Sequence, residues 1–462
     1  MIKITAFLLL VPALLLAGGR TDPQQKALVL THLTIIDVTG GAPKPDMTVV
    51  ITGPRITDLG EAGKVSVPQG GRVIDASGKF LIPGLWDMHV HWYYRDTLTL
   101  FTANGVTGIR QMFGNSDLLR WRDEIAKGSL QGPRMVVASP IIDGPQPVWP
   151  NSISVRDEAE GRKAVTRVKQ WGADFVKVYS LLPREAYFGI ADEARKQGLP
   201  FEGHVPFTVS AAEASDAGQK SIEHLTGVMQ ALSDNEAESR SERVNANSPP
   251  ARPRAGVMAI DTFSAKKEAE LFARFIKNGT WQCPTLTVRR STAYQDDPNF
   301  KNDDRLRYIP RQILERWGMR MGNRRAEFYA NEKRLFQKQV EVVGDMGRAG
   351  VLLLAGTDTG NPFCFPGFSL HDELALLVKA GLTPTESLRA ATLNPAKFFG
   401  LDQTLGTIEQ GKLADLVLLD ANPLEDIRNT QRIDAVIMNG RFYDRKALDN
   451  MLASAQTQAN LR

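Results

Sequence analysis

The 462-residue sequence contains only two cysteines, Cys283 and Cys364. Two cysteines exclude a disulfide framework and a zinc site built from cysteine ligands. A single disulfide bond between these two cysteines is one alternative in an oxidising compartment. Cys283 lies in an apolar, strand-like run, which favours a buried and inert thiol. The net charge is only +4, and no dense Lys/Arg stripe with interleaved aromatics occurs. The charge pattern therefore gives no reason to expect nucleic acid as a partner.

Long apolar runs are also lacking, apart from one of 13 residues at positions 4–16. Lys3 precedes this run, and the small residues Ala17-Gly18-Gly19 follow it. This layout is typical of a secretory signal peptide, here residues 1–19, and the run is short for a membrane span. We expect an exported protein, periplasmic or secreted, with no stable membrane insertion after cleavage. An uncleaved N-terminal anchor is the alternative, whereas Gly19 stands where a lipoprotein would need cysteine.

Short strand-like segments dominate both ends of the remaining chain. Those near the N-terminus are residues 28–36, 48–52, 55–59 and 72–75, separated by Gly, Pro and Asp turns, and those after Gly400 include 406–408, 414–420 and 434–439. Chain termini usually lie close together in space. We therefore predict a small composite β-sandwich module built from residues 26–83 and 405–445.

Residues 84–400 instead alternate short apolar runs with amphipathic, helix-like stretches. The expected strands are 85–91, 106–112, 134–139, 175–179, 200–204, 221–225, 281–287 and 351–357, and the expected helices include 158–171, 184–197, 265–278 and 328–349. This alternation predicts an α/β fold, a parallel (β/α)8 TIM barrel with its site at the carboxyl ends of the strands. Residues 234–261, which look like a long mobile loop, and 289–325 do not fit barrel units. They are either a lid or substrate wall at the barrel mouth, or surface decoration.

The placement of the six histidines is the most informative feature of the chain. His89 and His91 are two apart on an expected strand, so their side chains point to the same face. His204, His224 and Asp358 each end a further expected strand. Side chains that gather at the same ends of several strands indicate a metal site rather than isolated core histidines. Imidazole and carboxylate ligands suit zinc or a similar divalent ion in an open, catalytic arrangement.

Lys177 ends the expected fourth strand between apolar neighbours. Burial lowers the pKa of a lysine, so the neutral amine can react with carbon dioxide and offer two carbamate oxygens to metals. The alternative is a lysine whose amine simply reaches solvent.

Several further polar residues carry weaker signals. Asp87 faces the same side as His89 and is expected to support it. His371 opens an expected helix after the last strand, either near the metal site or at the surface. Arg289 and Arg290 either meet a substrate carboxylate or belong to an exposed charged loop.

The motif Leu81-Ile82-Pro83-Gly84-Leu85 followed by His89-Val90-His91 resembles the start of the amidohydrolase superfamily site. The resemblance covers about residues 26–445, and it is nearest to the imidazolonepropionase-like and prolidase-type dipeptidase branch. Its other elements are Lys177, His204, His224, Asp358, Gly105-Val106-Thr107, the stretch 382–396, and the stretch 406–417, which reads Gly406-Thr407-Ile408-Glu409-Gln410-Gly411-Lys412-Leu413-Ala414-Asp415-Leu416-Val417.

The resemblance implies two divalent metal ions, with zinc the expected element. His89, His91 and Asp358 would hold one ion and His204 and His224 the other, and a carbamylated Lys177 and a hydroxide would bridge them. Asp358 would be the catalytic proton carrier.

The implied enzyme is a metal-dependent amidohydrolase. It would cleave an amide or cyclic-amide C–N bond in a small substrate such as a dipeptide or an N-acyl amino acid. Val205-Pro206-Phe207 lacks the aromatic hydroxyl that dipeptidase relatives often carry after the fifth-strand histidine, which weakens the dipeptidase assignment. An ester, lactone or carbamate hydrolase, and an inactive exported metal-binding protein, are the alternatives. The sequence leaves open whether the protein forms a homo-oligomer.

Overall fold

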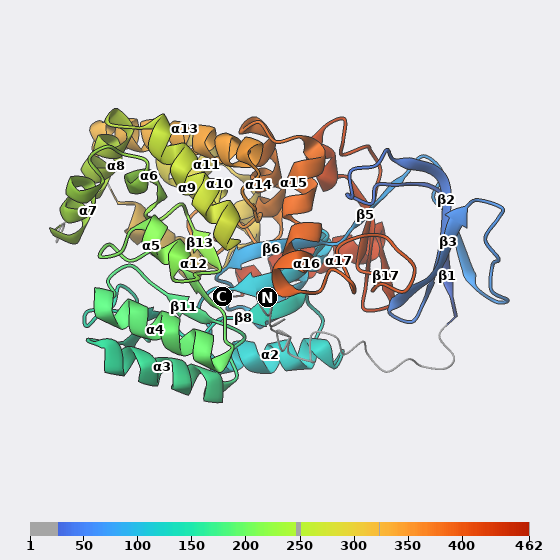
Figure 1. Cartoon of the computed structure of the whole chain (residues 1–462). Helices are drawn as coiled ribbons and strands as arrows, with labels where there is room; N and C mark the ends of the chain where they lie inside the picture. The colour runs from blue at the N-terminus through green and yellow to red at the C-terminus, as the bar shows by residue number, and fades with distance from the viewer. Residues whose placement is uncertain (1–25, 246–250, 323, 462) are drawn as a thin grey trace, which may run out of the picture.

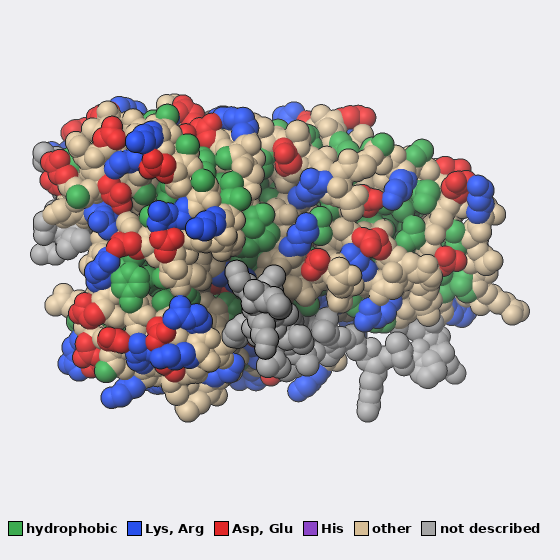
Figure 2. Space-filling model, in the orientation of Figure 1, with side chains coloured by type: hydrophobic (Ala, Val, Ile, Leu, Met, Phe, Trp, Pro, Cys, Tyr) green, Lys and Arg blue, Asp and Glu red, His purple; other side chains and the backbone are tan. Residues whose placement is uncertain are grey.

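The structure, a computed structural model, describes residues 26–245, 251–322 and 324–461. The expected signal peptide at residues 1–19 lies outside the described residues and stays a prediction. Figure 1 shows a helix-rich part beside a smaller part made mainly of strands β1, β2, β3, β5 and β17. On the face in Figure 2, acidic and basic side chains intermingle rather than separating by sign, as the small net charge suggests.

Strands from both ends of the chain share one eight-stranded sheet, ordered β17-β16-β15-β5-β1-β2-β3 with β4 beside β1. Its strands are β1 Leu28–Ile35, β2 Lys44–Thr52, β3 Arg55–Glu61, β4 Arg72–Asp75, β5 Phe80–Pro83, β15 Leu416–Leu419, β16 Ile433–Met438 and β17 Arg441–Asp444. The two chain ends join where β5 pairs with β15 in antiparallel register, Leu416 opposite Pro83. Alternate residues of these strands, such as Leu30 and Leu418, pack into a separate apolar core.

The middle of the chain contributes two parallel sheets, ordered β6-β7-β8 and β10-β9-β11-β12-β13-β14. The strands are β6 Leu85–Val90, β7 Val106–Gln111, β8 Arg134–Val137, β9 Ile142–Asp143, β10 Ile153–Ser154, β11 Val176–Val178, β12 Phe201–Gly203, β13 Ser221–Glu223 and β14 Trp281–Cys283. β6, β7, β8, β11, β12, β13 and β14 are buried along their whole length, as expected for strands covered on both faces.

Three isolated parallel bridges lie between these two sheets and the segment that contains Leu353 and Thr359. Ala138 pairs with Phe175 between the end of β8 and the start of β11, and Gln282 of β14 pairs with Leu353. Thr359, at the far end of the same extended segment, pairs with Val90 of β6. The expected eighth strand at 351–357 thus follows a strand path, but it forms isolated bridges rather than a continuous ladder.

Helices surround these strands (Figure 1). They are α1 Thr99–Ala103, α2 Ser116–Ala126, α3 Glu158–Trp171, α4 Arg184–Gln197, α5 Ala211–Asp216, α6 Val228–Ala231, α7 Glu236–Asn245, α8 Ala251–Asp261, α9 Ala265–Asn278, α10 Leu286–Ala293, α11 Pro298–Lys301, α12 Arg311–Met321, α13 Ala326–Ala349, α14 Phe368–Lys379, α15 Pro384–Ala390, α16 Leu393–Phe399 and α17 Arg445–Asn460, with short 3-10 turns at Arg95–Thr97, Asp304–Tyr308 and Ile427–Gln431. Across the described ranges, no helix combines the length and the apolar character needed to cross a membrane.

Several segments differ from expectation, among them residues 406–408, which were expected as a strand and form none. Residues 234–261 are not a long loop, because α7 and α8 occupy most of them. The strand expected at 281–287 ends at Cys283, since α10 begins at Leu286. Residues 289–325 contain most of α10 together with α11 and α12, so this stretch is a helical insertion after β14.

Candidate metal centre

His89, His91, His224 and Asp358, which come from three separate stretches of sequence, converge at one point of the fold. His89 lies within β6, and His91 comes directly after it. The Nε2 atoms of His89 and His91 are 3.3 Å apart. Asp358 Oδ1 lies 3.5 Å from His89 Nε2 and 3.3 Å from His91 Nε2, while its Oδ2 lies 3.9 Å from His224 Nε2. These atoms face one another at distances that a shared cation could bridge.

His204 extends the cluster on the side of β12 and β13. It follows β12, and its ring centroid lies 5.0 Å from that of His224, which follows β13. All four histidines of the predicted site therefore meet at the carboxyl ends of parallel strands.

The backbone at this edge is strained where the side chains must turn inward. His224, Thr285 and Asp358 have φ values of 58°, 49° and 59°, in a region that non-glycine residues seldom occupy. Strain of this kind clusters at functional sites because the surrounding structure must hold it in place. Next to Asp358, a Cβ on Gly356 would lie 2.9 Å from His89 N, so glycine is required for this close approach to β6.

Lys177, in the middle of β11, is fully buried beneath the histidines. Its Nζ forms no hydrogen bond with any described residue. Gly203 of the neighbouring β12 makes room for it, since a Cβ there would lie 3.0 Å from Lys177 Cδ. Burial lowers the pKa of Lys177 to about 8, against the opposing charges of Glu223 and Asp358. The outward-pointing alternative for this lysine is wrong.

Asp358 is the second buried group with an unused polar atom. Its Oδ1 has no hydrogen-bond partner within the described structure. Burial raises the pKa of Asp358 to about 7, and the charges of Lys177 and Arg320 act in the opposite direction. A buried carboxylate oxygen without a partner carries a desolvation cost that cation binding would offset, and the buried amine would become a metal-binding group only as a carbamate. The donor set therefore fits a divalent metal centre.

The histidines are held in the form that binds metals. Burial, with the nearby charge of Lys177 next in importance, lowers the pKa of His89 and His224 well below the usual range, so both rings are neutral. Three Nδ1 atoms are engaged away from the centre. His89 Nδ1 donates to Glu223 Oε2 at 2.7 Å, His204 Nδ1 lies 2.8 Å from Ser180 Oγ, and His224 Nδ1 lies 2.6 Å from Thr285 Oγ1. Such partners orient a metal-binding imidazole.

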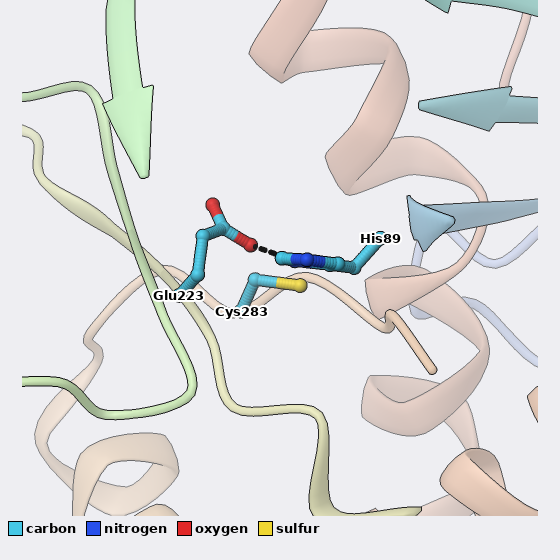
Figure 3. Close-up of side chains that lie close together, drawn as sticks. All are labelled: His89, Glu223 and Cys283. Carbon is cyan, nitrogen blue, oxygen red and sulfur yellow. Dashed lines mark hydrogen bonds and ion pairs between the residues drawn. The ribbon is translucent and has the colours of Figure 1, made fainter. Parts of the chain in front are cut away.

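Glu223, from β13, is a site residue that the sequence did not reveal. Figure 3 shows its carboxylate directed at His89, with the Cys283 thiol beside both. Arg110 of β7 donates to Glu223 Oε1 at 2.9 Å and to Glu202 Oε2 at 2.7 Å. Glu223 directly precedes His224 in the sequence. Because side chains alternate between the two faces of a strand, Glu223 points to the face opposite to that of His224, behind the histidines. That alternation was the available signal.

His89, Glu223 and Cys283 are close enough to be considered as a metal-ligand group of their own, as are His89, His91 and Asp358. The second group fits better, because the Nδ1 of His89 is already committed to Glu223. Both cysteines are free and buried, and burial raises the pKa of the Cys283 thiol well above its usual range. The expectation of a buried, inert Cys283 agrees with this environment.

The structure places Asp87 and His371 in different surroundings. Asp87 accepts hydrogen bonds from Thr357 N at 3.0 Å, Thr357 Oγ1 at 2.6 Å and His89 N at 3.2 Å, which ties β6 to the segment that leads to Asp358. His371 is buried in α14, where its Nε2 donates to Asn104 O at 3.1 Å. Both expectations for His371, a place at the metal site and a surface position, are wrong, because this ring fills a packing role between helices.

A cavity of about 810 Å³ opens above the centre. Its walls combine aromatic side chains with three arginines: Tyr93, Tyr94, Trp149, Tyr179, Phe207, Trp317, Arg289, Arg316 and Arg320. The insertion that contains α12 therefore forms part of the wall. Of the two arginines singled out in the sequence, Arg289 lines the cavity, whereas Arg290 pairs with Asp372 at 3.2 Å.

Fold and site together define an α/β protein with a candidate metal centre at the carboxyl ends of parallel strands. Residues 285–443 match the sequence profile of the amidohydrolase family. The chain is 40% identical over 91 residues to the ochratoxinase of Aspergillus niger, a match that covers 19% of this chain and 18% of the ochratoxinase. The chain thus spans less than a fifth of that relative.

Solved structures share the fold over almost the whole chain. A bottromycin amidohydrolase superposes with a TM-score of 0.77 at 23% identity, covering 96% of this chain and 93% of its own. A Xaa-Pro dipeptidase with methionine bound in its active site superposes with a TM-score of 0.65 at 21% identity, covering 91% of this chain and 100% of its own. The profile match over residues 285–443 and the shared fold agree with the resemblance to the amidohydrolase superfamily that the sequence motifs carry.

Proposed function

We propose that this protein is a metal-dependent amidohydrolase that cleaves an amide or cyclic-amide C–N bond in a small molecule. The observation that carries the proposal is the convergence of four histidines and Asp358 beside one cavity, which His91, His204, His224 and Asp358 line. Lys177 is buried with an unpartnered amine on the neighbouring strand β11. The relatives support the bond type, since their names include an amidohydrolase and a dipeptidase. A dipeptide or an N-acyl amino acid is the substrate we expect.

We further infer that residues 84–400 form a closed (β/α)8 barrel and that residues 26–83 and 405–445 form a β-sandwich module. The bridges Ala138–Phe175, Gln282–Leu353 and Val90–Thr359 support closure, because they link the two parallel sheets at both ends. The pairing of β5 with β15 supports a module shared by the two chain ends.

The ligand assignment follows the geometry and the resemblance. His89, His91 and Asp358 would hold one divalent ion, and His204 and His224 a second, with a carbamylated Lys177 between them. Zinc is the expected element, given imidazole and carboxylate donors. Bound divalent ions supply a water of lowered pKa and a Lewis acid for the scissile carbonyl.

Asp358 is the residue we assign to proton transfer. Its carboxylate accepts the proton of the attacking water and then delivers it to the leaving nitrogen. In the metal-free protein burial raises the pKa of Asp358 to about 7, and a bound divalent ion would lower this pKa again, so that Asp358 would be ionised and ready to accept the proton.

Metal analysis coupled to a hydrolysis screen tests the proposal. We expect about two metal ions per chain, with activity on dipeptides or N-acyl amino acids that Asp358→Asn reduces by about 100-fold or more. Asp345→Asn, on α13 and outside the cavity walls, is the control that keeps full activity. Lactones, esters and carbamates belong in the same screen, because exclusive activity on them would reassign the bond. Absence of metal, or full activity of Asp358→Asn, contradicts the mechanism.

A further inference from the structure

The charged side chains that line the cavity are mainly cationic. Among the described residues that line it, Asp358 is the sole carboxylate, whereas Arg289, Arg316 and Arg320 contribute three guanidinium groups. Asp358 belongs to the candidate metal centre, so it is not available to neutralise these cations. A cavity lined mainly by one sign of charge concentrates ligands of the opposite sign.

Two of the three arginines are committed to neighbours. Arg289 donates from Nε to Gln339 Oε1 at 3.1 Å, and its terminal nitrogen lies 3.4 Å from Glu332 Oε2. Arg316 donates to the Tyr94 hydroxyl at 2.8 Å. Both therefore have fixed positions in the wall and a reduced capacity for a ligand.

Arg320, on the last turn of α12, is different. No carboxylate and no hydrogen-bond acceptor among the described residues pairs with its guanidinium, which lies 5.2 Å from the centroid of the Trp149 ring. Stacking on an indole holds the planar group in place and leaves its N–H donors unused at the edge.

A chain of contacts leads from Arg320 to the metal centre. Trp149 Nε1 donates to the Tyr179 hydroxyl at 2.8 Å, and the Tyr179 ring stacks on His204 at 3.9 Å between centroids. The guanidinium is therefore separated from a candidate metal ligand by two aromatic side chains. A substrate that spans this distance would lie along an apolar wall.

We propose that Arg320 is a specificity-determining residue that binds a free carboxylate of the substrate, while the amide to be cleaved lies at the metal centre. The substrate class is then an amide with a free carboxylate and an apolar or aromatic group, which packs against Trp149 and Tyr179. The fork of the guanidinium matches a carboxylate bidentately, and the one-sided charge of the cavity disfavours cationic substrates. This inference rests on the proposed function, because it places the reacting bond at the same site.

The test compares two ligands that differ in one group. N-benzoyl-L-phenylalanine carries the carboxylate, and N-benzoyl-L-phenylalaninol replaces it with a neutral alcohol while keeping the same amide. We expect the protein to favour the acid by about 10-fold to 100-fold in kcat/KM. Arg320→Gln should bring this ratio near one, and Arg320→Lys, which keeps the charge but loses the fork, should give an intermediate ratio.

Arg311→Gln is the matched control. Arg311 lies on the same helix, pairs with Glu315 at 3.1 Å and does not line the cavity. This variant should keep the preference for the acid. Equal preference in Arg320→Gln and the parent protein, or no preference in the parent, overturns the inference.

Calorimetric binding of the same two ligands separates the inference from the proposed function. If neither ligand is hydrolysed, but the acid binds more tightly than the alcohol only when Arg320 is present, the carboxylate site stands and the hydrolase assignment fails. If both are hydrolysed equally well with and without Arg320, the hydrolase stands and the carboxylate site fails. A parent protein that neither binds nor cleaves the acid contradicts the carboxylate site.

Discussion

Glu223 shows how a buried carboxylate determines what a neighbouring histidine can do. By accepting the Nδ1 proton of His89 at 2.7 Å, it fixes the tautomer that directs the Nε2 lone pair toward His91 and Asp358. Arg110 in turn holds Glu223 through two short contacts of 2.9 and 3.0 Å. We therefore assign Glu223 as a positioning residue for the candidate metal centre.

Glu223→Gln should weaken metal binding by about 10-fold to 100-fold while the protein stays folded. The amide cannot accept from His89 and from Arg110 at once without turning its NH₂ group toward one of these donors. Metal affinity measured by competition with a chelator reports the loss. Glu202→Gln is the matched control, since Glu202 is equally buried and binds Arg110 but forms no hydrogen bond or ion pair with a histidine of the described residues. An equal loss of metal affinity in both variants would falsify the positioning role.

Lys177 leads to a prediction about carbon dioxide. With its pKa lowered to about 8 by burial, the amine is mainly protonated at pH 6.5 and mainly neutral at pH 9, and only the neutral form can become a carbamate. Zinc uptake by metal-depleted protein should therefore accelerate with added bicarbonate, and more strongly as the pH rises through 8. Stopped-flow measurement of uptake checks this.

Lys177→Met should remove the bicarbonate dependence. Lys220→Met should keep it, because Lys220 also has a pKa lowered by burial but lies over the Phe398 ring, outside the cavity. Bicarbonate dependence that survives in Lys177→Met would assign the effect to another group.

The residues of the candidate site were predictable because each lies in or near an expected strand, and parallel strands place their carboxyl ends together. Glu223 and Arg320 were not. The importance of Glu223 comes from a contact with His89, 134 positions away in the sequence. Arg320 matters because α12 crosses the cavity, which no local pattern in this arginine-rich stretch reveals.

At the scale of elements, three helices agree with the sequence to the residue: α3, α4 and α9. Their ends carry local signals, since Asp157 caps α3 and glycines at 172, 198 and 279 adopt the left-handed conformation that stops each helix. Residues 351–357 show the opposite case. The sequence of this segment is apolar, as expected for a strand. Whether the segment forms continuous hydrogen bonding with adjacent strands depends on those strands, which the local sequence pattern does not contain.

The C-terminal helix α17 and the helices within 234–261 were missed for a related reason. α17 is amphipathic only in part, and its buried residues Leu448, Met451 and Ala455 face other elements, including α1. α7 is strongly polar, and it contacts α8 and α6. Tertiary contacts decide such segments, and most helical stability comes from packing rather than propensity.

Gly356→Ala tests the segment that carries Asp358. A Cβ there would lie 2.5 Å from Cys283 Sγ and 2.9 Å from both N and Cβ of His89, so the segment must move away from β6. We expect a loss of about 1–3 kcal/mol in the free energy of unfolding, together with weaker metal binding. Urea unfolding and metal titration measure the two effects.

Two further variants make this test specific. Adding Cys283→Ala to Gly356→Ala should restore little, because the contact with the backbone of His89 remains. Gly318→Ala is the control, since Gly318 lies within α12 with nothing within 4 Å of its Cβ position. That change should stabilise the protein by up to about 1 kcal/mol. Normal metal binding in Gly356→Ala would show that the segment tolerates displacement.

At the scale of the whole molecule, one buried ion pair joins the shared sheet to the parallel strands. Arg134, the first residue of β8, donates from Nε to Asp415 Oδ2 at 2.6 Å, and each side chain is only 5% exposed. Asp415 directly precedes β15, and its carbonyl accepts from Gly84 N at 2.7 Å, just before β6 begins. The end of the sequence motif 406–417 thus lies at the contact between the two parts.

Asp415→Ala should lower the free energy of unfolding by about 3–5 kcal/mol, because it leaves the Arg134 charge buried without a partner. Asp420→Ala is the control within the same sheet, where a half-exposed carboxylate pairs with Lys79 at 2.6 Å and the expected cost is about 1 kcal/mol or less.

The seven tryptophans allow the coupling itself to be measured, since all of them lie between residues 86 and 317. Tryptophan fluorescence therefore reports the parallel strands and their helices, while far-ultraviolet circular dichroism reports the shared sheet as well. If the Arg134–Asp415 pair couples the two parts, the two urea transitions coincide in the parent protein and in Asp420→Ala but separate in Asp415→Ala. Coincident transitions with an unchanged midpoint in Asp415→Ala would mean that other contacts, such as the pairing of β5 with β15, carry the coupling instead.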